Sequence, residues 1–250
     1  MIPKVIHYCW LSNDPVPPKL QACIDSWKRV MPDYEVKLWN FDRFPRGKSA
    51  WVDQAFDCRK YAFAADYIRA YALYHEGGIY FDSDVEAVRP FDDLLEAPYA
   101  VCRECGSGLI EAAAMCAEAG HPLMGRLLDY YDNRRFVKED GSLDTVGMPA
   151  VRGRVLDGMK FRQADVDSIA QYGNSGNTLY VLPYDYFSPI NIENMDDRRT
   201  ARTYSVHHFA GSWLPPYRRF KKRVQKFLGP KMAQVVIDAK RRVKRLFGAS

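Results

Sequence analysis

The stretch "GGIYFDSDVE" at residues 77–86 ends an apolar run with two aspartates, Asp82 and Asp84, one residue apart. The preceding residues 58–76 are rich in Ala, Leu, Tyr and Arg and predict a helix that stops at the glycine pair. "GIYF" then predicts a short strand that leads straight into Asp82. In open α/β sheets, ligands bind beyond the carboxyl ends of the strands. The two aspartates therefore stand where such a sheet places its binding site.

The beginning of the chain predicts a parallel sheet. "KVIHYCW" at 4–10 and "YEVKLWN" at 34–40 have strand patterns, and helical spacing lies between them. A strand, a helix and a strand in this order usually start a parallel sheet. Farther along, 111–120 and 121–132 predict two helical pieces, whereas 133–180 gives mixed signals and no assignment. The expected fold class is therefore α/β.

Charge divides the chain into two parts. Residues 217–250 hold 12 of the 36 Lys and Arg residues and one of the 31 acidic residues, which leaves 1–216 with a net charge of about −6. We therefore predict one domain at 1–216 and a basic tail at 217–250.

The apolar runs and the cysteines indicate the compartment. No apolar run is long enough to cross a bilayer, and "MIPKVIHYCW" lacks the features of a secretory signal. The six cysteines are irregularly spaced, which favours free thiols over disulfides or a zinc site. We expect a cytoplasmic protein.

The spacing of Asp82 and Asp84 suits a divalent cation. Two carboxylates that point into the same space repel each other unless a positive charge lies between them. Hard oxygen ligands suit magnesium or manganese, which complete their coordination with substrate phosphates. The same pattern also makes a simple turn, because aspartate caps its own backbone. An EF-hand is excluded, because Ala87 and Asp93 stand where its loop needs Gly and Glu.

The segment "FAADYIRAYALYHEGGIYFDSDVEAVRPFDDLL" at 63–95 resembles the signature of the family 32 glycosyltransferases. This group, named for its DXD sugar-binding motif, includes bacterial capsule transferases, yeast α-1,6-mannosyltransferases and, distantly, the clostridial glucosylating toxins. The similarity extends to "IPKVIHYCW" at 2–10, "GHP" at 120–122, "LPYDYFSP" at 182–189 and "YSVHHFAGSW" at 204–213. The resemblance implies a GT-A fold, which is a Rossmann-like nucleotide-binding domain with a mostly parallel mixed sheet.

The resemblance also implies an activity, which is metal-dependent transfer of a hexose from a nucleotide sugar with retention. We expect UDP-hexose rather than GDP-mannose as the donor, and a lipid-linked or polysaccharide acceptor in capsule, surface polysaccharide or glycolipid synthesis. No carboxylate stands out as a nucleophile, which favours an internal return guided by the leaving phosphate. The alternative is a non-catalytic protein of the same fold that binds nucleotide sugars or anionic surfaces.

Roles for individual residues follow from the same resemblance. Asp82 and Asp84 would hold Mn²⁺ or Mg²⁺ and act in catalysis. Asp66 and Arg69, one helical turn apart, would bind the sugar and the phosphates, and the alternative for them is a surface ion pair of little energetic value. The other donor-binding residues that the resemblance implies are Trp10, Tyr80, Ser83, Ser212 and Trp213.

The motif "HHFAGSW" at 207–213 would supply the last metal ligand. Aligned on Trp213, His208 matches the ligand position better than His207. Adjacent residues of a strand point to opposite faces, so only one of the two histidines should be a ligand. Ser212 and Trp213 would act as a lid over the diphosphate.

One departure from the family stands before "GHP". Members commonly have an Asn there, whereas this chain has Glu111 and Ala112 near that place. The difference bears on how the sugar or the acceptor is held.

The tail at 217–250 combines apolar residues at helical spacing with Lys and Arg on the other face. This pattern is typical of helices that lie on an anionic membrane surface. We therefore predict a peripheral protein on the inner face of the cell membrane. The alternative is a solvated helix packed on the domain, and we expect no nucleic-acid partner because no recognition motif accompanies the charge.

Overall fold

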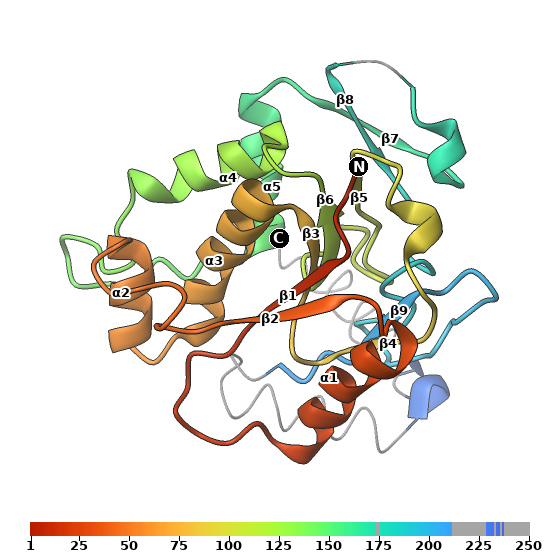
Figure 1. Cartoon of the computed structure of the whole chain (residues 1–250), viewed down its shortest axis with the longest axis horizontal. Coiled ribbons are helices and arrows are strands. Elements are labelled where there is room, and N and C mark those ends of the chain that lie inside the picture. The colour runs from red at the N-terminus through yellow and green to blue at the C-terminus, as the bar shows by residue number, and fades with distance from the viewer. Residues whose placement is uncertain (174–175, 212–228, 233, 236, 238–250) are drawn as a thin grey trace.

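A five-stranded sheet forms the centre of the molecule (Figure 1). The structure is a computed structural model that describes residues 1–173, 176–211, 229–232, 234–235 and 237. The strands, in the order β2-β1-β3-β6-β5, are Glu35–Trp39, Val5–Cys9, Gly78–Phe81, Ala114–Ala117 and Tyr99–Ala100. Both neighbours of β6 pair antiparallel with it, so the other four strands share one direction. The predicted α/β fold with a mostly parallel mixed sheet is confirmed.

Helices cover both faces of this sheet (Figure 1). On one face lies α1 (Pro18–Val30). The helices on the other face are α2 (Ala50–Asp57), α3 (Tyr61–Glu76), α4 (Pro122–Asp132) and α5 (Met148–Gly158). Two short 3₁₀ helices, η1 (Asp92–Leu94) and η2 (Ile169–Gln171), lie in the connections.

Strand β3 shows why the sheet is buried on both sides. Ile79 and Phe81 belong to the apolar cluster beneath α1, and Tyr80 between them belongs to the cluster beneath α3. Successive side chains of a strand point to opposite faces, so a continuous apolar run suits a strand with helices on both sides.

The two glycines before β3 allow α3 to turn directly into the sheet. Gly77 has φ of 66° and Gly78 has φ of 112°, which are conformations that other residues rarely adopt. A Cβ at Gly78 would lie 2.6 Å from the carbonyl oxygen of Val5 in β1. The close approach of β1 and β3 therefore requires glycine, and it brings the ends of both strands to one edge.

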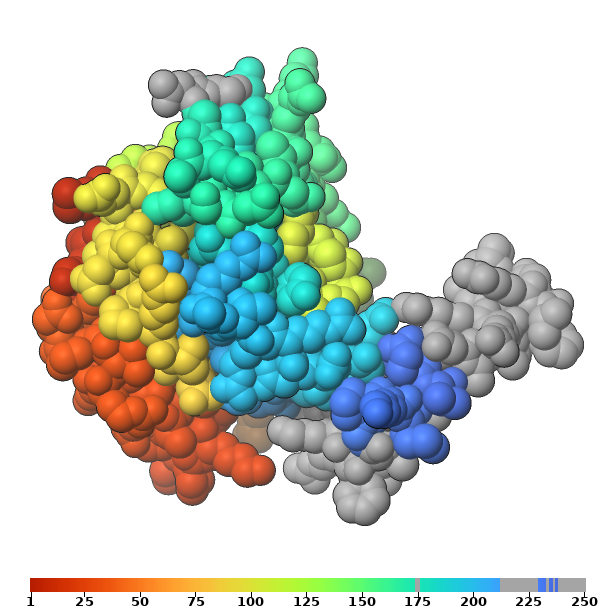
Figure 2. All heavy atoms as spheres, turned by 90° about the vertical axis from the view of Figure 1, so that its right-hand side faces the viewer, coloured from red at the N-terminus to blue at the C-terminus, as the bar shows by residue number. Residues whose placement is uncertain are grey.

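Two short pairs of strands flank the sheet. In one, β4 (Val85–Ala87) pairs antiparallel with β9 (Ser205–His207); in the other, β7 (Arg162–Asp165) pairs parallel with β8 (Thr178–Val181). Figure 2 shows the face that carries them, with β7 and β8 in teal above the light-blue residues that lead to β9. The pairing of β4 with β9 brings residues 205–207 next to the segment that follows β3.

Most predicted elements of the first half of the chain are present. The strand, helix and strand at the start are confirmed as β1, α1 and β2, and the helix expected at 58–76 starts at Tyr61 because α2, which was not predicted, ends just before it. The helix expected at 121–132 is α4. The helix expected at 111–120 is wrong, because its alanines form β6, buried between β3 and β5.

Other expectations concern the whole chain. All six cysteines are free, as predicted. Among the described residues, no helix has the length and apolar character needed to cross a membrane. Most of the predicted tail at 217–250 lies outside the described residues, so the division at 216 stays a prediction.

Candidate active site

Both aspartates lie in the turn that joins β3 to β4. The amide of Val85 donates to the carbonyl of Asp82 at 3.0 Å, which closes the turn. The amide of Asp82 donates to the carbonyl of Ala113 at 2.7 Å and ties the turn to the segment before β6. The two aspartates therefore do form a turn, and this turn lies at the carboxyl end of β3. We call this side of the sheet, where β1 and β3 end and β6 begins, the carboxyl edge.

A cavity of about 370 Å³ opens at the carboxyl edge, a volume typical of small-molecule sites. We call it the DXD cavity. It collects residues that are far apart in the sequence. The predicted site residues that line it are Trp10, Arg69, Tyr80, Asp82, Ser83 and Asp84. Ser212 and Trp213, the predicted lid, lie outside the described residues.

Arg69 is the buried centre of the cavity wall. Its guanidinium contacts Asp66 at 3.0 Å and Asp82 at 3.2 Å, and it donates to the carbonyl of Ala112 at 2.6 Å. It also stands over the ring of Tyr80, 4.8 Å from the centroid. The side chains of Arg69 and Asp66 are only 4% and 9% exposed, so the surface ion-pair interpretation is wrong.

Asp66 supports Arg69 rather than the cavity itself, because it is not among the residues described as lining the cavity. Burial raises the pKa of Asp66 to about 7, with Arg69 opposing and Asp82 adding to the shift. Burial also raises the pKa of Asp82, against the attraction of Arg69, and neighbouring Asp84 raises it further. Asp66 is therefore a buried carboxyl and Asp82 a partly buried one, and the structure disfavours the ionisation of both although each contacts Arg69.

The antiparallel pairing of β4 and β9 brings a histidine to Asp84. His207 lies opposite Val85, its Nε2 is 3.6 Å from an Asp84 oxygen, and its Nδ1 is 3.1 Å from a Glu111 oxygen. His208 instead contacts Glu86 at 2.9 Å. The two imidazoles do reach different partners, as expected, but it is the His207 imidazole that lies beside the Asp84 carboxylate, whereas His208 donates only its backbone amide to the Asp84 carbonyl, at 3.0 Å.

Glu111, the residue at the departure from the family pattern, is part of this cluster. One of its oxygens accepts the amides of Ala112 and Ala113 at 2.7 and 2.8 Å, and its side chain is 2% exposed. Burial opposes its ionisation, but His207 and the hydrogen bonds outweigh burial and lower the pKa of Glu111 to about 2. The pKa of Asp84 is lowered to about 2 in the same way.

His207 experiences the converse effect. Burial disfavours its charge, but Glu111 and Asp84 outweigh burial and raise the pKa of His207 well above its ordinary value. The two carboxylates beside the imidazole therefore favour its protonated form in the metal-free protein.

Arg152 is a site neighbour that the sequence did not reveal. It lies on α5, it is fully buried, and it donates to the carbonyl of Glu111 at 2.7 Å. Burial, with Arg69 adding to it, lowers the pKa of Arg152 to about 10. An arginine in a helix is usually exposed, so nothing in the pattern of 133–180 distinguishes this one.

The residues of the DXD cavity fit a divalent cation. Asp82 and Asp84 offer hard carboxylate oxygens, and His207 adds a nitrogen. Among the described residues, the potential ligand atoms that lie within 4.8 Å of one another come from Glu104, Glu111 and His207, and His207 in turn lies 3.6 Å from Asp84. A cation would also relieve the unfavourable ionisation of Asp82.

One protein family matches the chain over residues 17–100, the "Glycosyltransferase sugar-binding region containing DXD motif". Residues 17–100 are thus similar to this family. The DXD region contains most of the described cavity residues, whereas β9 and Glu111 lie beyond it.

Named relatives are similar over about half of the chain. Inositol phosphoceramide mannosyltransferase 3 of Schizosaccharomyces pombe is 37% identical over 127 residues, which cover 49% of this chain and 35% of that protein. Mannosyl phosphorylinositol ceramide synthase SUR1 of Saccharomyces cerevisiae is 30% identical over 148 residues, 55% of this chain and 37% of that protein. The chain thus spans little more than a third of these relatives.

A solved structure titled "PaToxG Glycosyltransferase" aligns with a TM-score of 0.48 and 22% identity. The alignment covers 63% of this chain and 69% of that one. A score at this level does not bear on function.

Proposed function

We propose that the chain is a metal-dependent, retaining hexosyltransferase that uses a nucleotide-sugar donor. One observation carries the proposal: the two aspartates of a DXD region line a cavity together with Arg69, Tyr80 and Trp10. A general sugar-binding protein has little use for two carboxylates and a histidine in the lining of one cavity. A transferase needs them to hold the cation that binds the donor diphosphate.

The residues of the cavity divide the donor between them in this proposal. Asp82, Asp84 and His207 would hold Mn²⁺ or Mg²⁺, which supplies a Lewis acid for the leaving diphosphate. Arg69 provides a fixed positive charge beside the phosphates, and Asp66 positions it through their 3.0 Å contact. The ring of Trp10, at the end of β1, offers a surface on which the donor base stacks.

The donor sugar follows from the relatives rather than from the cavity. The resemblance to the family favours UDP-hexose, whereas both named relatives are mannosyl-transferring proteins of inositol phosphoceramide. These names favour a mannose donor and a glycolipid acceptor for this chain, within the broader class of lipid-linked and polysaccharide acceptors. GDP-mannose therefore belongs in the donor panel beside UDP-glucose and UDP-galactose.

The basic tail supports the proposal of a membrane-bound acceptor. Two apolar side chains within 217–250, Met232 and Val235, are 53% and 61% exposed. Exposed apolar residues among many Lys and Arg residues suit the cytoplasmic surface of an anionic membrane. Sedimentation of the full chain with anionic vesicles at low salt tests this point, and no binding there would remove the membrane from the proposal.

The decisive experiment measures nucleoside diphosphate released from each donor in the presence of Mn²⁺, by mass spectrometry. We expect one donor to be hydrolysed slowly by the wild type and by Asp129→Asn, a control at an exposed position of α4. Asp84→Asn should abolish the release.

The non-catalytic alternative makes a different prediction for the same panel. Binding of one donor without release, even when glycan or glycolipid acceptors are added, would favour a nucleotide-sugar binding protein. If no donor binds at all, the proposed function is wrong.

A further inference from the structure

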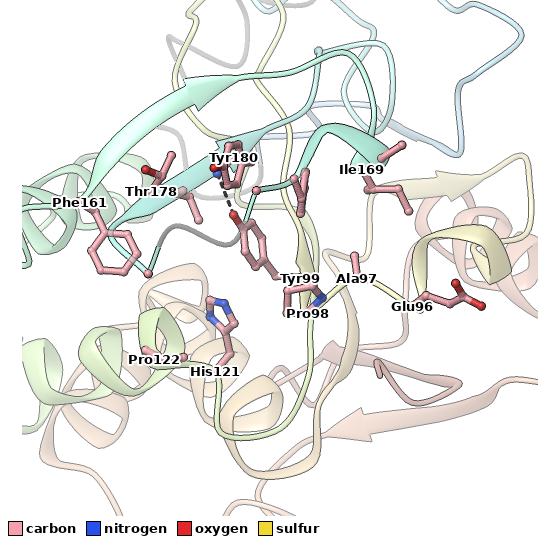
Figure 3. Close-up of a pocket in the computed structure, with 15 residues that line it drawn as sticks. Glu96, Ala97, Pro98, Tyr99, His121, Pro122, Phe161, Ile169, Thr178 and Tyr180 are labelled. Carbon is pink, nitrogen blue, oxygen red and sulfur yellow. Dashed lines mark hydrogen bonds between the residues drawn. The ribbon is translucent and has the colours of Figure 1, made fainter.

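A larger cavity, of about 610 Å³, lies elsewhere in the molecule (Figure 3). Its walls come from the start of β5, the start of α4, the segment around η2, and β8. We call it the aromatic pocket. The ring-bearing residues that line it are Tyr99, His121, Phe161, Tyr172 and Tyr180.

The aromatic pocket lies at the opposite edge of the sheet from the DXD cavity. Tyr99 pairs with Ala117 of β6, and Ala117 pairs with Gly78, the first residue of β3. Asp82 lies four residues farther along the chain, which is about 13 Å along the strand direction. No described residue lines both cavities. We call this side of the sheet, where β3 and β5 begin, the amino edge. The pocket here is therefore separate from the DXD cavity.

The rings form a wall that is already in place. Tyr172 and Tyr180 stack with centroids 5.4 Å apart, and Tyr99 contacts Tyr172 at 5.2 Å and His121 at 4.9 Å. The amide of Tyr180 donates to the Tyr99 hydroxyl at 2.7 Å, the dashed line in Figure 3. The figure shows Tyr99, His121 and Phe161 around one open space. A ligand would meet preformed ring surfaces.

The charge of the lining excludes phosphorylated ligands. None of the described lining residues is Lys or Arg, and Glu96 is the single acid among them. Phosphates bind where cations or clustered backbone amides receive them. A nucleotide or an anionic lipid headgroup therefore has no counterpart here.

Polar atoms among the rings argue against a purely apolar ligand. The Tyr172 hydroxyl and Nδ1 of His121 are buried and have no hydrogen-bond partner among the described residues. A hydrocarbon chain would leave both atoms unpaired, whereas a ligand that carries hydroxyls can pair with them after a small side-chain adjustment. A sugar ring combines such hydroxyls with an apolar face of C–H groups that packs on aromatic rings.

We propose that the aromatic pocket binds a neutral saccharide unit of a glycan, independently of the nucleotide-sugar donor. The stacked tyrosine rings suit the apolar face of a sugar, and the unpaired polar atoms suit its hydroxyls. The lack of cations among the described lining residues suits a ligand without negative charge. Identifying the glycan as the acceptor of the transfer reaction rests on the proposed function. The binding itself does not.

The test measures binding of neutral tetrasaccharides of glucose, mannose and galactose to the full chain by saturation-transfer NMR, without metal or nucleotide. At least one should bind to the wild type. Tyr180→Ala should weaken binding at least tenfold, and Tyr172→Phe, which keeps the ring, should weaken it a few-fold. Tyr130→Ala, which removes a partly buried tyrosine of α4 outside the pocket, is the matched control and should bind like the wild type.

Asp84→Asn separates this proposal from the proposed function. It should bind the tetrasaccharide normally while it releases no nucleoside diphosphate, and Tyr180→Ala should still hydrolyse the donor. If no donor is turned over by any variant, the tetrasaccharide result still decides the pocket.

Three outcomes would overturn the proposal. The first is no binding of any tetrasaccharide at millimolar concentration. The second is binding that Asp84→Asn removes and Tyr180→Ala leaves intact, because the saccharide would then occupy the DXD cavity. The third is binding of decanol in the pocket with no tetrasaccharide bound, which would assign the pocket to a lipid chain.

Discussion

The two edges of one sheet carry opposite chemistries. At the carboxyl edge, buried charges surround the cavity: Arg69 contacts Asp66 and Asp82, and His207 lies between Asp84 and Glu111. At the amino edge, the larger pocket is lined by aromatic rings and by no Lys or Arg among the described residues. The first can hold a diphosphate and a cation, whereas the second can offer only contact area and hydrogen bonds.

The difference also concerns stability. Buried charges cost free energy unless each is paired, and at the carboxyl edge the pairing is incomplete because Nε of Arg69 and Nε of Arg152 have no partner among the described residues. Stacked tyrosines at the amino edge stabilise the fold through buried area and ring geometry. The carboxyl edge therefore contains imperfectly paired buried charges, whereas the amino edge contains stabilising ring contacts.

The largest expected effect separates the two edges by activity. Asp84→Asn should reduce transfer by more than about 100-fold, because even residues that only support metal ligands contribute about 10–100-fold. Initial rates with the donor found in the panel measure this effect. A similar loss in Tyr180→Ala would break the comparison, since the amino edge would then act in the chemical step.

The next effect distinguishes the two histidines. His207→Asn should weaken Mn²⁺ binding about 10–100-fold, because the Nε2 atom beside Asp84 is lost. His208→Asn removes only the contact with Glu86 and should change the affinity less than about threefold. Titration of Mn²⁺ followed by electron paramagnetic resonance measures both. A larger loss of Mn²⁺ affinity in His208→Asn than in His207→Asn would instead support His208, the ligand that the sequence favoured.

The sequence predicted which residues of β3 and α3 lie at the carboxyl edge, and the reason is physical. Asp82 and Asp84 follow a strand directly, and Asp66 with Arg69 lies on the preceding helix, so short-range patterns and the family resemblance already place them together. The choice between His207 and His208 depends on how β9 pairs with β4 across more than 100 residues, and no local pattern contains that register.

The parts that the sequence missed depend on tertiary contacts. The alanines of β6 favour a helix locally, but burial between two strands overrides that preference. Glu111 and Arg152 become neighbours only through the contact between the segment before β6 and α5. The aromatic pocket is likewise assembled from 96–99, 121–122, 161–173 and 176–180, and the sequence of the last two ranges gave no clear signal.

A third expected effect measures the cost of the charged edge. Because burial raises the pKa of Asp66 to about 7 from an ordinary value of 3.8, the folded state loses stability as pH rises between these values. Asp66→Asn has no such loss. Relative to the wild type it should gain about 1–2 kcal/mol in the free energy of unfolding between pH 4.5 and pH 6.

Urea unfolding of metal-free protein at several pH values tests this effect. Asp129→Asn, at an exposed position, serves as the control and should follow the wild type at each pH. A constant difference between Asp66→Asn and the wild type across this range would show that Asp66 is ionised throughout, held so by Arg69.

The smallest expected effect is a change in the free energy of unfolding at the amino edge. Tyr172→Phe removes a buried hydroxyl that has no partner among the described residues but keeps the stacking with Tyr180. It should raise the free energy of unfolding by about 0.5–1 kcal/mol, because an unpaired buried polar group costs free energy.

Tyr186→Phe is the control, since it removes a hydroxyl that donates to the carbonyl of Asp167 at 2.9 Å. It should lower the free energy of unfolding by a similar amount. A loss of stability in Tyr172→Phe would mean that its hydroxyl is already paired in solution. A gain in stability together with weaker tetrasaccharide binding would show that the hydroxyl is retained for the ligand.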